Sequence, residues 1–194
     1  MLNDHEIQAH CLDILATTGP SPAVGLEMLD VTRQPALDLW NIGHLYTRTE
    51  NYVLEALSQA VDWPKAWNHS FELYTSVFRV ALRHRLPLYA LNLPHALVRK
   101  VGFGGLEALS PEELRQIPNP IIMPHPVQRV SLKTIVKHHQ RLAKDKGRPV
   151  FDTDRFFLVQ TLWDTKMATE ALALRYRLSR PIVVLAGARH IGHG

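Results

Sequence analysis

Three short runs of apolar residues have the length and composition of strands that are buried in a parallel sheet. They are residues 23–29 (AVGLEML), 87–93 (PLYALNL) and 181–187 (PIVVLAG), and each is bounded by proline or glycine. A stretch with helical spacing precedes each run. Because helices and strands alternate, the sequence predicts an α/β fold, a parallel sheet flanked by helices and joined by right-handed crossovers.

Apolar residues recur at helical spacing between these strands. In residues 4–17, one helical face carries Ile7, Cys11, Ile14 and Leu15. The other predicted helices are residues 35–60 with possible breaks near Gly43, and residues 70–85, 110–117, 131–147 and 152–178. We therefore expect residues 1–194 to form a single domain, in which residues 94–178 are a mostly helical insert or lid before the last strand.

The predicted elements begin and end abruptly. The first helix opens at residue 4 without a strand before it, and the sequence stops soon after the last strand. An α/β unit normally supplies a strand at that point, because a lone sheet edge is costly to leave open. We expect both termini to be truncated.

Polar side chains occur at the carboxyl ends of the predicted strands, where parallel sheets bind ligands. Glu27 lies in an apolar run, so it must be paired or hydrogen-bonded, either with a nearby arginine or within a binding site. Asn92 fits a binding site too, or it satisfies backbone groups at the strand end. His190 and His193 are three residues apart, which fits a metal site, a solvated terminal loop or direct contact with a ligand.

Aromatic residues gather in two further segments. Residues 63–74 (WPKAWNHSFELY) hold two tryptophans, for which core packing is the usual role, together with Tyr74. Tyr74 is a candidate ligand, because a tyrosine phenolate can bind ferric haem iron. On predicted helix 152–178, Gln160 and Trp163 share a face, which fits core packing or contact with a ligand.

Composition narrows the class of protein. The chain has 194 residues, is 46% hydrophobic and carries a formal charge of +4, which fits a globular domain. Its basic residues form no cluster interleaved with aromatic residues, so we expect no nucleic-acid partner. One cysteine allows no internal disulfide. No apolar run approaches the length of a membrane span. A glycine-rich phosphate loop, a nucleophile elbow and a paired Cys-x-x-Cys are all absent from the sequence.

Six blocks of the sequence resemble one family, in the same order. They are GLEMLDVTRQPALDLW, WPKAWNHSFELY, PLYALNLP, GLEALSPEEL, LVQTLWDTKMA and VVLAGARHIGHG. Together they resemble the ChaN-type haem-binding uptake family of the wider Tiki/TraB-like superfamily. The resemblance implies a parallel α/β core with a helical lid, and homodimers that hold haem between protomers.

The same resemblance implies a role in iron or haem acquisition, by binding rather than by catalysis. It also implies a periplasmic or outer-membrane lipoprotein, whose lipid anchor would lie outside this chain. The alternative is a metal-dependent hydrolase of the wider superfamily, in which Glu27 and His190 would bind a divalent metal. A third possibility is a binding or structural domain without a cofactor.

The resemblance assigns roles to individual residues. It places Glu27 at the family's strand-end acid, Asn92 at the pocket floor and His190 in the second Gly-x-x-His motif, GARH. It makes Tyr74 the first candidate for the iron ligand, with His190 as the other. His193 completes the expected haem-binding set.

This sequence also departs from the family pattern. The Gly-Glu-x-His motif that ends the family's first strand is absent, so a metal site that uses it cannot be complete. Arg189 stands where the family often has glycine, and it cannot reproduce the close backbone approach that glycine allows.

Overall fold

The structure is a computed structural model that describes residues 4–43, 48–123, 126–147, 150 and 153–191. Contacts divide the chain into two compact units. The first comprises residues 1–92 and 170–186, and the second comprises residues 93–169 and 187–194.

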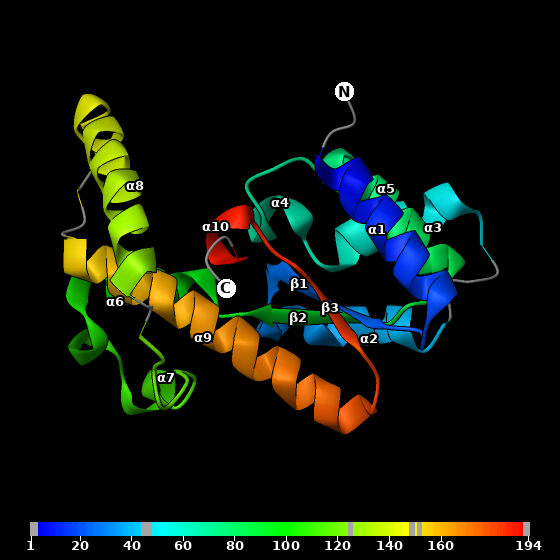
Figure 1. Ribbon diagram of the computed structural model, residues 1–194. Helices are drawn as coiled ribbons and strands as arrows, with labels where there is room; N and C mark the ends of the chain where they lie inside the picture. Colours follow the sequence, from blue (N-terminus) through cyan, green and yellow to red (C-terminus); the bar gives the residue numbers. More distant parts are fainter. Residues whose placement is uncertain (1–3, 44–47, 124–125, 148–149, 151–152, 192–194) are drawn as a thin grey trace. The chain divides into compact units, whose positions relative to one another are not determined.

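The first unit contains a three-stranded parallel sheet (Figure 1). Its strands are β1 (Ala23–Asp30), β2 (Leu88–Asn92) and β3 (Ile182–Leu185), and their order is β2-β1-β3. The central strand β1 is buried along its whole length, as the continuous apolar run predicts. The predicted α/β class, a parallel sheet flanked by helices, is confirmed.

Helices of the first unit pack around this sheet. They are α1 (Asp4–Thr18), α2 (Gln34–Asn41), α3 (Glu50–Ala60), α4 (Trp63–Ala66), α5 (Thr75–Arg83) and the end of α9 (Thr153–Leu178). Helices α1 and α5 lie side by side, and α2 lies against β2 (Figure 1). The hydrophobic core formed by these helices and the sheet is centred on fully buried residues of β1 and β2, such as Leu26 and Leu88.

The predicted helices agree with the structure in one detail and differ from it in another. The break expected near Gly43 within residues 35–60 is present, because Gly43 has a φ of 76° that ends α2. The helix expected over residues 70–85 begins at Thr75, and the preceding Phe71–Tyr74 is a 3₁₀ turn. That turn directs Tyr74 into the core, where it is 7% exposed.

The side of helix α1 that packs against the core is not the side that its apolar spacing suggests. Its buried residues are Ala9 and Leu12, whereas Ile7, Ile14 and Cys11 on the predicted face are exposed. Periodicity identifies an apolar face but not the side on which a neighbouring element lies. This helix therefore presents an apolar surface to solvent.

The second unit is helical. Its elements are α6 (His95–Gly104), the 3₁₀ turn Leu106–Ala108, α7 (Pro111–Leu114), α8 (Pro126–Asp145), residues 153–169 of α9, and α10 (Ala188–Ile191). A separate core holds α6 and α9 together through residues such as Val101 and Leu162. Ser110 caps α7 in a capping box with Glu113.

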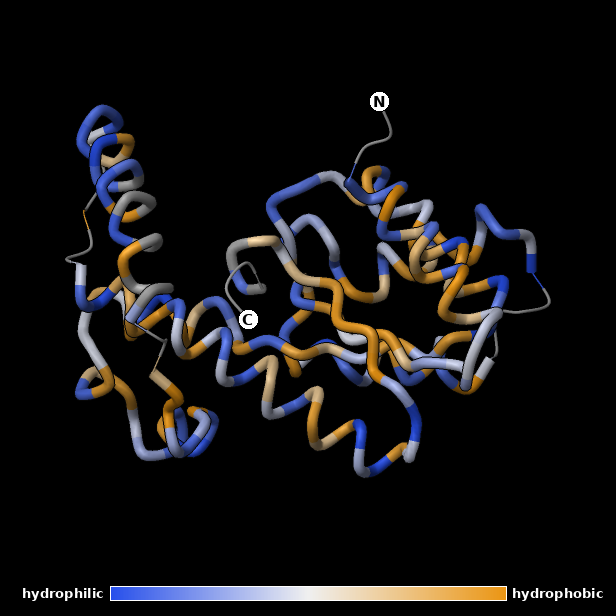
Figure 2. The backbone as a smooth tube through the Cα atoms, viewed as in Figure 1, coloured by the Kyte–Doolittle hydropathy of each residue, from blue (hydrophilic) through white to orange (hydrophobic). Residues whose placement is uncertain are grey.

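Apolar residues are distributed along the helices as amphipathic faces rather than as continuous runs (Figure 2). None of the helices in the described ranges combines the length and hydropathy that a bilayer-spanning segment requires.

Candidate functional site

Glu27 and Asn92 lie on adjacent strands of the sheet. Glu27 is near the end of β1 and only 8% of it is exposed. The Asn92 side chain, at the end of β2, donates a hydrogen bond from Nδ2 to the Glu27 backbone oxygen at 2.9 Å. Asn92 therefore satisfies a backbone group, and in doing so it ties the two strand ends together next to the Glu27 carboxylate.

Tyr74 lies in the core of the same unit. Its hydroxyl accepts a hydrogen bond from Trp67 Nε1 at 2.8 Å, and its ring contacts those of His5 and Trp63 with centroid distances of 4.1 and 5.2 Å. Burial raises the pKa of the Tyr74 phenol, and the negative charge of Glu27 raises it further, although the Trp67 hydrogen bond opposes the shift. The phenol is therefore held in its neutral form.

We call Glu27, Asn92, Tyr74 and Trp67 the strand-end cluster. Asn92 contacts Glu27 directly, the charge of Glu27 acts on Tyr74, and Tyr74 is bound by Trp67. The structure thus brings three of the predicted site residues into one unit. Trp67 is a member that sequence reasoning missed, because core packing is the usual role of a tryptophan.

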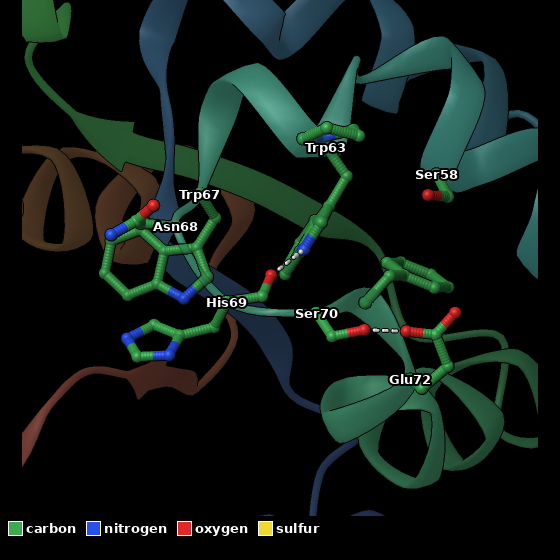
Figure 3. Close-up of a pocket in the computed structure, with 9 residues that line it drawn as sticks. Ser58, Trp63, Trp67, Asn68, His69, Ser70 and Glu72 are labelled. Carbon is green, nitrogen blue, oxygen red and sulfur yellow. Dashed lines mark hydrogen bonds between the residues drawn. The ribbon is translucent and has the colours of Figure 1, made fainter.

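A pocket with a volume of about 390 Å³ lies beside this cluster. Its lining residues are Ser58, Trp63, Pro64, Trp67, Asn68, His69, Ser70, Phe71 and Glu72 (Figure 3). The volume is in the range of small-molecule sites. Trp63 donates Nε1 to the His69 backbone oxygen at 2.8 Å, and the Trp67 and His69 rings lie 5.8 Å apart. The pocket is therefore lined by both aromatic and polar side chains.

His190 lies in the second unit, in the short helix α10. Its Nδ1 is 2.5 Å from Oδ1 of Asp164 on α9, and the two side chains are 10% and 26% exposed. The carboxylate fixes the orientation of the imidazole and directs Nε2 away from Asp164. Metal-ligating histidines in proteins usually carry such a carboxylate or carbonyl on the second ring nitrogen.

Trp163 lies next to this pair of His190 and Asp164. Its ring meets the His190 ring edge to face at 6.3 Å. The buried indole Nε1 finds no acceptor among the residues that the structure describes. A buried donor without a partner is unusual in a native protein.

Asp164 could not be identified from sequence spacing, because 26 residues separate it from His190. The sequence offered one indication of its role. Asp164 is a carboxylate in the largely apolar block LVQTLWD and follows Trp163, which shares a helix face with Gln160. The role of such a helix residue can be inferred only when the fold shows which side chain it contacts.

The predicted site residues are distributed over the two units. Glu27, Tyr74 and Asn92 belong to the first and His190 belongs to the second, whereas His193 lies outside the described residues. Within the described part of the chain, no three His, Cys, Asp or Glu side chains converge to hold a metal ion. The roles of the individual residues therefore stay predictions.

Comparison with known proteins adds a family and a fold. A solved structure described as "Cofacial heme binding to ChaN of Campylobacter jejuni" is similar to this chain, with 18% identity and a TM-score of 0.62. The alignment covers 95% of this chain and 65% of that one, so this chain spans just under two thirds of its length. At this identity the similarity shows the fold alone.

No curated protein sequence matches this chain. The family described as "Haem-binding uptake, Tiki superfamily, ChaN" matches residues 2–194. Because that match covers nearly the whole sequence, the chain belongs to the ChaN haem-binding uptake family of the Tiki superfamily.

Proposed function

We propose that this protein binds haem and acts in haem or iron acquisition. The observation that carries the proposal is the family match over residues 2–194. When bound, haem would supply an iron centre to be sequestered or transferred, and the residues of this chain would hold it. The proposal concerns binding, and no step of catalysis is needed for it.

The second unit contains groups that fit this cofactor. Histidine is an established axial ligand of haem iron, and the Asp164 carboxylate orients the His190 ring through Nδ1. The Trp163 ring lies edge to face against this imidazole. An aromatic side chain next to an oriented histidine suits contact with a porphyrin. His190 is therefore our candidate for the iron ligand.

Tyr74 is the other candidate from the sequence, and its surroundings favour it less. A tyrosine ligates iron as the phenolate, but burial and the nearby charge of Glu27 raise the pKa of Tyr74. Its hydroxyl is also occupied by the hydrogen bond from Trp67. Ligation by Tyr74 would require this core packing to open. We therefore propose that Tyr74 stabilises the strand-end cluster.

Titration of the purified chain with haemin, followed by the Soret band, tests the proposal. We expect a saturable shift for the wild type and its loss in His190→Ala. Asp164→Asn should weaken binding, because an amide holds the imidazole less firmly than a carboxylate does. Tyr74→Phe should retain the shift. His10→Ala is the matched control, because it removes an exposed histidine from the other unit.

Two outcomes would count against this assignment. A wild-type protein that shows no saturable shift would refute haem binding. A shift that survives His190→Ala but disappears in Tyr74→Phe would transfer the ligand role to tyrosine. Circular dichroism of each variant separates these results from a loss of fold.

Two finer points are also proposals. Haem held between two protomers predicts that haemin increases the molar mass measured by light scattering. Export as a lipoprotein rests on the resemblance of the sequence blocks, and the cellular fraction that contains the native gene product would test it.

A further inference from the structure

Helix α8 of the second unit carries an excess of positive charge on one side. It contains five lysines and arginines and a single acidic residue, Asp145. Lys133, Lys137, Arg141 and Lys144 are all exposed. Their spacing of four, four and three residues places them on one face of the helix, over roughly 16 Å of its length. We call these four residues the basic stripe.

The side of α8 that packs is not the side that carries the basic stripe. Val136 lies about a quarter of a turn from the stripe and is 2% exposed. Hydrophilic and hydrophobic positions alternate along the described part of α8 (Figure 2). The helix therefore packs through an apolar side, while the stripe faces solvent.

The charges of the stripe are not neutralised by neighbouring side chains. Exposed basic residues elsewhere lie next to a carboxylate, for example Lys65 at 2.8 Å from Asp62 and Arg115 at 3.1 Å from Glu112. In the ranges that the structure describes, the three lysines of the stripe form no ion pair of this kind. Like charges four residues apart on a helix repel each other and destabilise it. An anionic partner on the stripe would remove this cost.

The composition of α8 favours an anionic lipid surface over a protein or a nucleic acid. Three of the four members of the stripe are lysines, which are depleted at protein interfaces. The helix has no tryptophan, tyrosine or phenylalanine that could anchor a protein or stack on a base. Ammonium groups on long, flexible stems suit the mobile charges of lipid headgroups. Val130, in line with the stripe, is 67% exposed and adds an apolar contact.

We propose that the basic stripe of α8 is a docking surface for the anionic headgroups of a lipid bilayer. The helix lies against the surface with its four cations toward the headgroups, and it does not enter the hydrocarbon. Each basic residue close to an anionic bilayer raises the partition coefficient by about fivefold, so four together raise it by several hundredfold. Because the attraction is electrostatic, it weakens as salt is added. The contact requires no haem.

Co-sedimentation of the full chain with lipid vesicles, in the absence of haemin, tests this surface. We expect the chain to pellet with vesicles of equimolar phosphatidylcholine and phosphatidylglycerol, to be released from them by salt, and to stay in the supernatant with pure phosphatidylcholine. The triple variant Lys133→Gln, Lys137→Gln, Arg141→Gln should lower the partition coefficient by about a hundredfold. Glutamine is a good helix former, so circular dichroism and the thermal midpoint should match those of the wild type.

A second triple variant separates the stripe from the net charge of the chain. Lys65→Gln, Arg115→Gln, Arg175→Gln removes the same charge from three exposed positions outside α8, and its partition coefficient should stay within about fivefold of the wild type. A folded stripe variant that loses no more binding than this control would overturn the proposal, because attraction would then follow net charge.

Two results with the wild type would also overturn it. One is a chain that does not pellet with the anionic vesicles, or that pellets equally with pure phosphatidylcholine. The other is a chain that binds a DNA duplex more tightly than the anionic vesicles, which would assign the stripe to a nucleic acid. Because haemin is absent, none of these results bears on haem binding.

Discussion

Replacement of Tyr74 by phenylalanine separates a structural role from an iron-ligand role. The change removes one hydroxyl, which is buried and accepts the Trp67 indole N–H at 2.8 Å. Leaving the partly buried Trp67 N–H without its acceptor costs about 1–3 kcal/mol of stability. Part of this cost is offset, because the variant has no phenol hydroxyl to remove from water on folding. We expect a net loss of about 1–2 kcal/mol in the free energy of unfolding at neutral pH. For a chain of this length that lowers Tm by roughly 2–8 °C.

The same variant has a defined pH dependence. The folded pKa of Tyr74 is raised above its unfolded value, so its contribution to stability is fully present below about pH 10 and is lost as pH rises through the folded pKa. Phenylalanine cannot ionise. The difference in stability between the wild type and Tyr74→Phe should therefore shrink at alkaline pH.

Urea unfolding followed by circular dichroism, at neutral pH and above the ordinary tyrosine pKa, measures both effects. Tyr52→Phe is the matched control, because Tyr52 is exposed and its loss should leave stability within about 0.5 kcal/mol of the wild type. A Tyr74→Phe protein as stable as the wild type at neutral pH would refute the structural role. A stability gap that stays constant or widens above pH 10 would contradict the pKa argument.

Three further changes test the fold. Gly25→Ala should lower stability by about 1–3 kcal/mol in thermal unfolding, because the added Cβ would lie 2.5 Å from the side chain of buried Leu91. Gly19→Ala is the control and should be neutral, because its Cβ would have no neighbour within 4 Å. Asn41→Ala should cost about 1–3 kcal/mol in urea unfolding, because the β2 edge loses both hydrogen bonds that the Asn41 side chain makes to its backbone. The His84 hydrogen bond holds the pKa of Asp13 below its ordinary value, so stability should fall as acid protonates Asp13, and Asp13→Asn should flatten that decline.

The sequence predicted the strands well, because each apolar run is bounded by a residue that ends regular structure. The run at residues 23–29 became β1, Ala23–Asp30. The break near Gly43 was predictable for a similar reason, since glycine tolerates the positive φ found there. These features depend on local chemistry, which a single sequence contains.

Features that depend on tertiary contacts could not be predicted in the same way. The 3₁₀ turn before α5 buries Tyr74, and no spacing pattern distinguishes it from the first turn of a helix. The Asp164 carboxylate meets His190 only because two distant segments fold together. The open face of α1 shows the same limit, because its apolar period does not reveal which side is covered.

The most direct test of the central claim is a haemin titration of the wild type beside His190→Ala, recorded at the Soret band. We predict a saturable shift in the wild type that is lost in the variant while its circular dichroism spectrum stays unchanged. A wild type without a saturable shift, or a folded variant that binds haemin as the wild type does, would contradict the account.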